Sequence, residues 1–209
     1  MLSAHKNIIC LKLFKESECT HVRYGMGAIF VWRVFDFYGM ILIGKTRHFR
    51  RKNKMIKILF VCHGNICRSP MAEFIFKDMV KKMGIEKEFF VQSSATSTEE
   101  IWGDKGNPVY PPAKKKLAEH NISCDGKRAV QLKKDDYDKY DYIIGMEQVN
   151  VRNILKIVKE DKENKVFRLM DFTDNKKDIQ DPWYSGNFDI TYDEIYEGCK
   201  GLLRYLGFL

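Results

Sequence analysis

A short apolar run, Ile56–Val61, leads directly into a loop that begins at Cys62 and ends at Arg68. The run favours a β-strand, and from Ser69-Pro70 onward the apolar side chains recur at helical spacing. A strand, a loop and a helix in this order bring backbone N–H groups and a helix N-terminus together around an anion. With a thiol at one end and a guanidinium at the other, the loop is predicted to bind a phosphate group and to supply a nucleophile.

The rest of the chain alternates between apolar strands and amphipathic helices. Strands are predicted at residues 89–95, 142–146 and 166–170, helices at residues 70–83, 111–120 and 149–158, and a loop at residues 96–110. Thr191 and Glu194 are predicted to open a final helix as a capping box. This alternation predicts a three-layer α/β/α fold, in which helices cover both faces of a four-stranded parallel sheet. The phosphate-binding loop after the first strand then lies at the carboxyl edge, where such sheets bind ligands.

The charge of the chain is unevenly distributed. Residues 1–54 contain eleven Lys and Arg against three Asp and Glu, which accounts for the whole net charge of +8. Residues 55–209 contain twenty-five of each. We therefore predict a basic, aromatic-rich N-terminal extension, residues 1–54, followed by one domain, residues 55–209. The balanced domain gives no reason to expect nucleic-acid binding.

The extension contains an aromatic-rich apolar run, Gly25–Gly44, that is interrupted by Arg33 and Asp36 and followed by a basic cluster. A membrane-spanning helix needs about 20 mostly apolar residues, and two central charges argue against one. Three interpretations remain: an anchor at a membrane surface, a segment packed on the domain, or the upstream part of an over-long reading frame. We favour the last, with a natural start at Met55, because Met55 directly precedes the first strand. Membrane contact is expected only through residues 1–54.

Six cysteines occur in the chain, and they form no Cys-x2-Cys pair and no regular framework. This pattern indicates reduced thiols in a reducing compartment, and we predict a cytoplasmic protein. No metal site and no cofactor are expected.

Two motifs together identify a family. Residues 62–70 read CHGNICRSP, and residues 181–184, far downstream, read DPWY. They resemble the corresponding motifs of the low-molecular-weight protein tyrosine phosphatase family, and the resemblance extends over residues 56–207. Ser94, His120, and Met146 with Asn150 are further matches, whereas Glu147 stands where the family commonly has aspartate. The resemblance implies a metal-independent enzyme that hydrolyses phosphotyrosine in proteins through a phosphocysteine intermediate.

Three residues are predicted to carry the chemistry. Cys62 is the expected nucleophile, because loop amides, a helix N-terminus and a nearby cation all lower the pKa of a thiol. Arg68 is expected to clamp two phosphoryl oxygens with its planar fork, which lysine lacks. Asp181 is expected to protonate the leaving tyrosine oxygen and later to activate water. Spacing alone leaves Asp181-Pro182 open as an ordinary turn, and the resemblance supports the catalytic role.

The remaining predicted site residues bind the substrate or support the loop. Gly64 can adopt backbone angles closed to other residues, and Asn65 tolerates left-handed geometry. Trp183 and Tyr184 are expected to line a deep slot for a phenyl ring, with core packing as the alternative for one of them. Ile101 and Trp102 are weaker candidates for the opposite rim. The substrate-binding set is His63, Gly64, Asn65, Ile66, Cys67, Ser69, Trp183 and Tyr184; Asn65 and Ser69, with Ser94 and His120 in support, are expected to form a hydrogen-bond network that favours the thiolate.

Several alternatives stay open. Cys67 either forms a reversible disulfide with Cys62 that protects the nucleophile or is a small buried side chain. A protein-arginine phosphatase is a close relative with Thr where this chain has Ile66, and the apolar residue favours phosphotyrosine. A thiol-dependent arsenate reductase would need a further cysteine pair, but none of the cysteines lies between Cys67 and Cys124. From another class, a non-catalytic phosphate-binding module is disfavoured because Cys62, Arg68 and Asp181 are all present.

Overall fold

The computed structural model describes residues 54–209. The predictions made for the basic extension therefore fall outside the described residues, apart from Lys54.

Four parallel strands form the central sheet. They are β1 (Ile56–Cys62), β2 (Phe89–Ala95), β5 (Tyr142–Gly145) and β6 (Val166–Arg168), in the spatial order β2-β1-β5-β6. The prediction of a four-stranded parallel sheet is confirmed. β1 is central and buried on both faces, which explains why its sequence is apolar almost throughout rather than alternating.

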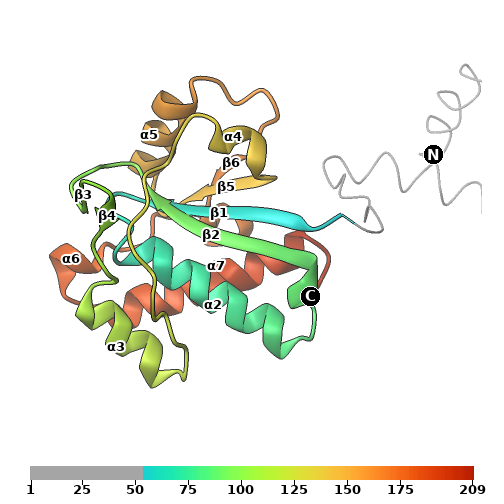
Figure 1. Cartoon of the computed structure of the whole chain (residues 1–209). Helices are drawn as coiled ribbons and strands as arrows, with labels where there is room; N and C mark the ends of the chain where they lie inside the picture. Colours follow the sequence, from blue (N-terminus) through green and yellow to red (C-terminus); the bar gives the residue numbers. More distant parts are fainter. Residues whose placement is uncertain (1–53) are drawn as a thin grey trace, which may run out of the picture. The chain divides into compact units, whose positions relative to one another are not determined.

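Helices cover both faces of this sheet (Figure 1). The helices are α2 (Arg68–Lys82), α3 (Pro111–Glu119), α4 (Asp136–Lys139), α5 (Gln148–Val158), α6 (Pro182–Ser185) and α7 (Phe188–Tyr205), with short 3-10 turns η1 (Glu86–Glu88) and η2 (Leu169–Phe172). On one face, Ile58 and Phe60 pack in a core with α2, α3 and α7. On the other face, Leu59 and Val61 pack against α4 and α5. These are the three layers that the alternating sequence predicts.

Most predicted element ends agree with the structure to within one residue, and three larger differences occur. The first helix begins at Arg68, two residues before Pro70, so Arg68 belongs to its first turn. The predicted loop at 96–110 contains a small hairpin, β3 (Ile101–Trp102) with β4 (Lys105–Gly106). The predicted strand at 166–170 ends at Arg168 because η2 begins there, with Asp171 accepting from the Arg168 backbone N–H.

The predicted capping box at the final helix is wrong. α7 begins at Phe188, and the side chain of Asn187 caps it by accepting from the Ile190 N–H at 3.1 Å. Thr191 instead donates to the backbone carbonyl of Gln180, and Glu194 accepts from the Gln180 N–H. Both side chains thus bind the segment that enters α6, and Oγ1 of Thr191 also lies 3.1 Å from the carbonyl oxygen of Asn187.

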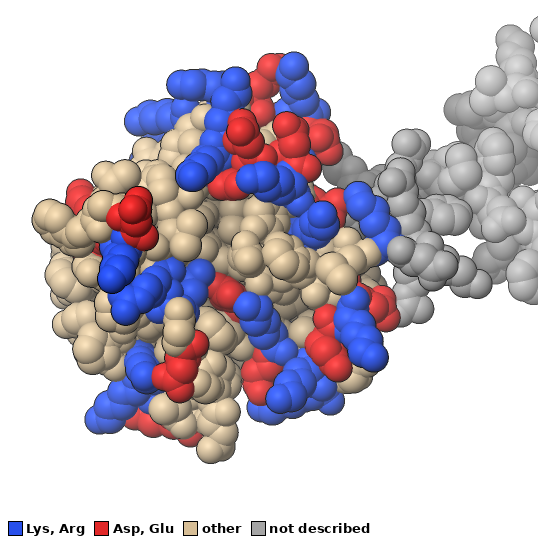
Figure 2. Space-filling model, viewed as in Figure 1, with Lys and Arg blue, Asp and Glu red and all other residues tan. Residues whose placement is uncertain are grey.

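The surface of the described residues mixes both signs of charge (Figure 2). Lysine and arginine side chains alternate with aspartate and glutamate on the visible face, in agreement with the equal numbers of the two kinds in residues 55–209. Within the part of the chain that the structure describes, no helix is both long and apolar enough to cross a membrane.

Candidate active site

Cys62 ends β1 at the carboxyl edge of the sheet, and the loop that follows curls around its thiol. Cys62 is only 4% exposed. Its Sγ accepts a hydrogen bond from the Asn65 backbone N–H at 3.2 Å and lies 3.0 Å from Oγ of Ser69. The neighbouring strands end at Ala95 and Gly145, at the same edge, so the segments that follow them can also contribute to the site.

The loop keeps its shape through Asn65 and Gly64, but in different ways. Asn65 is in the left-handed region, with φ of 57°, as its sequence position indicates. Gly64 has no positive φ, which corrects the expectation of an unusual backbone angle. A Cβ at Gly64 would lie 2.9 Å from Cγ of Glu100, so a larger residue there would require the Glu100 side chain to move. Within residues 54–209, the N–H groups of Gly64, Ile66 and Cys67 donate to no protein acceptor, so they are available to an anion.

A buried hydrogen-bond network supports the loop from behind. The side-chain nitrogen of Asn65 donates to Oγ of Ser69 at 2.8 Å and to Oγ of Ser93 at 2.9 Å. The side-chain oxygen of Asn65 accepts from the Val130 N–H at 3.0 Å, which fixes the orientation of the amide. Ser93 in turn donates to Glu73 of α2 at 2.6 Å. Asn65 and Ser69 thus belong to a network, as predicted, but its other members are different.

The side chains of Ser94 and His120, which were predicted to support the loop, do not join this network. The Ser94 hydroxyl is buried and has no hydrogen-bond partner among the described residues, and only the Ser94 carbonyl oxygen accepts from Ser69, at 3.4 Å. His120 follows the end of α3, and its ring stacks on Tyr192 with ring centroids 3.8 Å apart. Adjacent residues of a strand point to opposite faces of the sheet. Ser93 and Ser94 therefore face opposite sides, and Ser93 is the one that joins the network.

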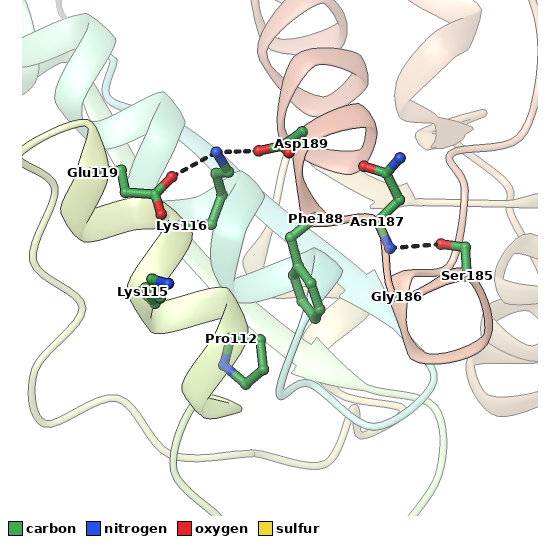
Figure 3. A pocket seen from close by; sticks show the side chains of 9 residues that line it. All are labelled: Pro112, Lys115, Lys116, Glu119, Ser185, Gly186, Asn187, Phe188 and Asp189. Carbon is green, nitrogen blue, oxygen red and sulfur yellow. Dashed lines mark hydrogen bonds and ion pairs between the residues drawn. The ribbon is translucent and has the colours of Figure 1, made fainter.

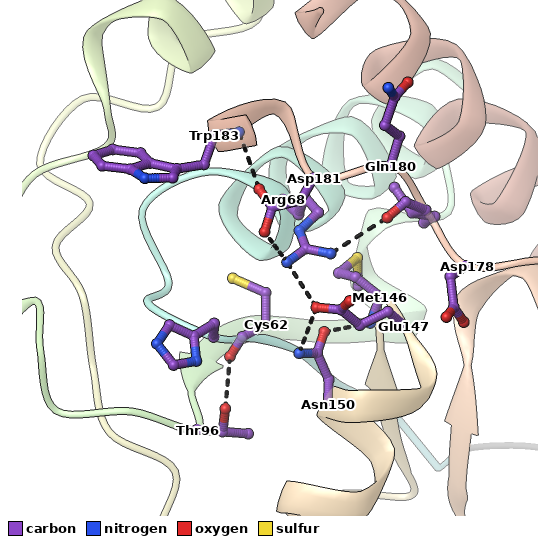
Figure 4. Close-up of polar contacts among 12 residues, drawn as sticks. Cys62, Arg68, Thr96, Met146, Glu147, Asn150, Asp178, Gln180, Asp181 and Trp183 are labelled. Atoms are coloured by element: carbon purple, nitrogen blue, oxygen red, sulfur yellow. Dashed lines mark hydrogen bonds and ion pairs between the residues drawn. The ribbon is translucent and has the colours of Figure 1, made fainter. Parts of the chain in front are cut away.

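Arg68 lies beneath the loop with its side chain only 3% exposed (Figure 4). One terminal nitrogen, Nη2, lies 2.8 Å from a carboxylate oxygen of Glu147 and also contacts Asp181. The other, Nη1, donates to the Ile179 carbonyl at 3.3 Å. Burial opposes the positive charge, but the nearby Cys62, Asp181 and Glu147 raise the pKa of Arg68 above its ordinary value. The guanidinium is therefore fixed in direction and permanently charged.

Glu147 is the residue whose role the sequence leaves in doubt. It follows β5 and reaches Arg68 directly, and its carboxylate also accepts from the side-chain amide of Asn150 at 3.1 Å. Asn150 is itself anchored, since its oxygen accepts from the Met146 N–H at 3.2 Å. Sequence reasoning missed this orienting contact to Arg68, although Met146 and Asn150 had marked the segment.

Asp181 comes from the opposite end of the chain and meets Cys62 and Arg68 at the same edge of the sheet (Figure 4). It caps the short helix α6 by accepting from the Trp183 N–H at 3.0 Å, and its second oxygen contacts Arg68. The Asp-Pro motif is thus both a helix start and a member of this cluster. The two functions are compatible because a carboxylate has two oxygens.

Aromatic side chains border the site on the side of α6. Trp183 is 58% exposed and Tyr184 is 87% exposed, so neither packs in the core. Trp183 lies against Tyr110, with ring centroids 5.2 Å apart. Ile66 of the loop is buried beside Ala129, with Tyr110 packed against the same small cluster.

The other border of the site is formed by the loop that follows β2. His63 is half-exposed, and its Nε2 lies 2.9 Å from a carboxylate oxygen of Glu99. Ile101 packs against the cluster that contains Ile66, and Trp102, on the β3–β4 hairpin, is 73% exposed.

Cys67 is a free, buried thiol at the end of the loop. Burial, together with the negative charge of nearby Cys62, raises the pKa of Cys67 above its ordinary value. Cys67 is therefore held as a neutral thiol while Cys62 faces hydrogen-bond donors. The reversible disulfide between the two stays a prediction.

A cavity of about 490 Å³ lies between α3 and the turn that joins α6 to α7 (Figure 3). It shares no lining residue with the phosphate-binding loop. Lys116 contacts both Glu119 and Asp189 there, and this pairing joins α3 to the first turn of α7. The contact helps to fix α6, which carries Trp183. Within residues 54–209, no group of three or more His, Cys, Asp or Glu side chains could hold a metal ion.

Comparison with known proteins supports the family resemblance that the two sequence motifs indicate. The model of the family described as "Low molecular weight phosphotyrosine protein phosphatase" matches residues 57–207. The low molecular weight protein-tyrosine-phosphatase YfkJ of Bacillus subtilis is 38% identical over 151 residues, which are 71% of this chain and 94% of YfkJ. The protein PtpA of Staphylococcus aureus, which carries the same description, is 36% identical over 153 residues, 73% of this chain and 94% of PtpA.

Solved structures agree with these relatives. The crystal structure of YfkJ from Bacillus subtilis matches with a TM-score of 0.68 and 35% identity, over 75% of this chain and 97% of YfkJ. The arginine phosphatase YwlE matches with a TM-score of 0.61 and 26% identity, over 73% of this chain and 96% of that structure. That structure is of a variant with serine in place of a cysteine, and its active-site serine is phosphorylated. By its sequence and its fold, the chain belongs to the low molecular weight phosphotyrosine protein phosphatase family.

Proposed function

We propose that this enzyme hydrolyses phosphotyrosine in proteins through a phosphocysteine intermediate on Cys62. The observation that carries the proposal is the meeting of Cys62, Arg68 and Asp181 at one edge of the sheet, although Asp181 lies far from the other two in the sequence. A thiol, a buried guanidinium and a carboxyl group are the parts that phosphoryl transfer to sulfur needs. The phosphorylated active-site serine of the YwlE variant supports a covalent intermediate at the corresponding position.

In the first step, the Cys62 thiolate attacks phosphorus and the bond to the tyrosine oxygen breaks. Arg68 and the free loop amides hold the equatorial phosphoryl oxygens and stabilise the charge that spreads over them. Because the substrate oxygens compete with Asp181 for Arg68, binding releases the Asp181 carboxyl group toward the leaving oxygen. Asp181 gives its proton to that oxygen, and tyrosine departs as the neutral phenol.

In the second step, the ionised Asp181 takes a proton from water, and the water oxygen attacks phosphorus. The bond between phosphorus and sulfur breaks, inorganic phosphate leaves, and Cys62 returns to a thiolate. The hydrogen bonds from Asn65 and Ser69 to the sulfur stabilise this leaving group as they stabilise the starting nucleophile. No cofactor enters the cycle.

The exposed aromatic border favours an aromatic substrate. Trp183 and Tyr184 are exposed rings at the border of the site, where they can pack on a phenyl ring whose phosphate reaches the buried loop. A phosphoserine side chain is shorter and has no ring, so it gains neither the contact nor the reach. Phosphotyrosine-containing proteins are the substrates that we infer, and the cytoplasmic location stays a prediction from the cysteine pattern.

A protein-arginine phosphatase is the second candidate, because YwlE shares this fold. Ile66, buried beside Ala129 and Tyr110, favours phosphotyrosine because it offers an apolar surface where a polar residue would suit a guanidinium. The arsenate reductase alternative gains no support, since Cys124 is buried and has no cysteine near it in the sequence.

The test is turnover of phosphotyrosine and phosphoarginine peptides of matched sequence, in the presence of a chelator. We expect phosphotyrosine hydrolysis by the wild type, none by Cys62→Ser, and a gain of phosphoarginine activity in Ile66→Thr. Cys124→Ser, which changes a buried cysteine outside the loop, is the matched control and should retain activity. Hydrolysis that persists in Cys62→Ser would rule out the phosphocysteine mechanism, and a wild-type preference for phosphoarginine would rule out the substrate.

A further inference from the structure

The mechanism requires that the Asp181 carboxyl group keep its place when it loses its contact with Arg68. That contact is direct, and the phosphoryl oxygens of a bound substrate compete for the same guanidinium. One oxygen of Asp181 still accepts from the Trp183 N–H at 3.0 Å. A hydrogen bond to one carboxylate oxygen does not fix the backbone that carries the side chain. The position of Asp181 therefore also depends on how the segment before it is held.

The residue directly before Asp181 is bound at both of its backbone polar groups by side chains of α7. The Gln180 N–H donates to Oε2 of Glu194 at 2.8 Å, and the Gln180 carbonyl oxygen lies 3.0 Å from Oγ1 of Thr191. A residue has only two soft backbone dihedrals, so binding both its N–H and its C=O restricts the direction in which the chain continues. The backbone that enters Asp181 is therefore oriented by α7.

Glu194 is the stronger of the two attachments. It binds the segment with both carboxylate oxygens, since Oε1 lies 2.5 Å from Nζ of Lys177 while Oε2 accepts from Gln180. Its side chain is only 11% exposed. Thr191 has a single hydroxyl proton, and its Oγ1 also lies 3.1 Å from the carbonyl oxygen of Asn187, so this proton is shared with the start of its own helix.

Loss of the Glu194 contact should cost little stability. Gln180 is exposed, so water can bind its N–H when Glu194 is replaced, and no buried donor is left without a partner. The freedom of the segment, however, increases. A displacement of a reacting group by about 1 Å can lower a rate by about 100-fold, so the consequence should appear in catalysis rather than in stability.

We propose that Glu194 is a positioning residue for Asp181: it holds the Gln180 N–H and so keeps the Asp181 carboxyl group within reach of the leaving oxygen. The proposal deepens the function proposed above and rests on Asp181 being the general acid. Glu194 acts through the backbone of Gln180 and touches no reacting atom. Thr191 assists it from the carbonyl side.

The experiment compares kcat/KM of the full chain for phenyl phosphate and for p-nitrophenyl phosphate, because kcat/KM measures stabilisation of the transition state in which the leaving group departs. Phenolate needs a proton to leave, whereas p-nitrophenolate is stable as an anion. We expect Glu194→Ala to lower kcat/KM about tenfold for phenyl phosphate and less than about twofold for p-nitrophenyl phosphate. Glu194→Gln keeps an oxygen that can accept from Gln180 and should restore most of the loss. Asp193→Ala, at the exposed neighbouring position of α7, is the matched control and should change neither value.

A double-mutant cycle tests whether Glu194 acts through Asp181. In an Asp181→Asn background the acid is absent, so Glu194→Ala should not change the ratio of the two kcat/KM values further. An equal fall of the ratio in both backgrounds would overturn the proposal, because Glu194 would then act on another part of the site. If Glu194→Ala does not fold, Thr191→Val should lower the ratio and Thr191→Ser, which keeps the hydroxyl, should not. In that case an unchanged ratio in Thr191→Val would overturn the proposal.

A purely structural role gives a different result. Glu194→Ala would then lower thermal stability and reduce both kcat/KM values by the same factor, or leave both unchanged, and either outcome would overturn the proposal. The proposed function fails separately. Equal losses on the two substrates in Asp181→Asn would contradict the general acid, and with it the positioning role, whereas phosphotyrosine turnover that persists in Cys62→Ser would exclude the nucleophile.

Discussion

The two sides of Cys62 are built in opposite ways. Behind the thiol, Asn65, Ser69 and Ser93 are almost fully buried, and hydrogen bonds join all three. In front of it, Trp183 and Tyr184 are largely exposed on the short helix α6. We call these regions the floor and the rim of the site. The side chains of the floor are held in place by hydrogen bonds, whereas the side chains of the rim are exposed to solvent.

We therefore expect the floor to control the chemical step and the rim to control which substrate binds. A change in the floor leaves a buried donor or acceptor without a partner, which costs far more than an exposed contact returns. A change in the rim alters what binds but leaves the reacting groups in place. Arg68 belongs to the floor and yet contacts Asp181, which the rim helix carries. The four expectations below test the division, from the largest effect to the smallest.

Arg68→Lys should abolish most of the activity. Lysine keeps the charge but cannot hold two phosphoryl oxygens in a plane, so we expect kcat to fall by about 10³-fold or more. Steady-state kinetics with p-nitrophenyl phosphate measure it, and Arg152→Lys, at an exposed position of α5, is the control that should retain activity. A loss of only a few-fold would place Arg68 outside the chemical step.

Asp181→Asn should lower kcat by about 10²-fold or more for phenyl phosphate, because the leaving phenolate then departs without a proton. The loss should be smaller for p-nitrophenyl phosphate, whose leaving group is already stable as an anion. Asp178→Asn, three residues earlier and paired with Arg168, is the control. Equal losses on the two substrates would assign Asp181 to the arrangement of Arg68 rather than to proton transfer.

Trp183→Ala should affect binding rather than chemistry. We expect KM for a phosphotyrosine peptide to rise by about tenfold, the equivalent of one lost ring contact, with kcat within about twofold. Trp102→Ala removes a more exposed ring from the β3–β4 hairpin and should have the smaller effect. A fall in kcat without a change in KM would show that the rim takes part in the chemical step.

The smallest effect should appear in stability, at acidic pH. The pKa of Glu73 is lower in the folded protein than in the unfolded chain. Ionised Glu73 therefore contributes fully to the free energy of unfolding above its pKa in the unfolded chain. This contribution is lost as the pH falls through its pKa in the folded protein. Below about pH 4.3, wild-type stability to urea should therefore decline. Glu73→Gln should cost about 1 kcal/mol at pH 7 and flatten that decline. An unchanged slope would mean that another carboxylate dominates.

The contrast between floor and rim also explains how far the sequence predicted the site. Local sequence patterns were sufficient to predict the strand, the loop and the helix around Cys62 and Arg68. These elements are contiguous, and their order alone brings the two residues together. The left-handed Asn65 was predictable for the same reason, since backbone geometry depends on the residue itself. The DPWY motif could also be located from the sequence, although only the fold brings Asp181 to Arg68.

The partners of the floor could not be predicted from local pattern. Whether Ser93 or Ser94 faces the loop depends on the register of β2 against β1, and one residue reverses the side chain. Glu73 pairs with Lys127, which follows Gly126 in an irregular segment where no periodicity marks it. His120 was predicted to belong to the network from its residue type, but its ring stacks on Tyr192. The sequence by itself determined the fold class, the family and the loop between Cys62 and Arg68. Only the tertiary structure decided which distant side chains orient that loop, because such contacts depend on packing between elements rather than on order along the chain.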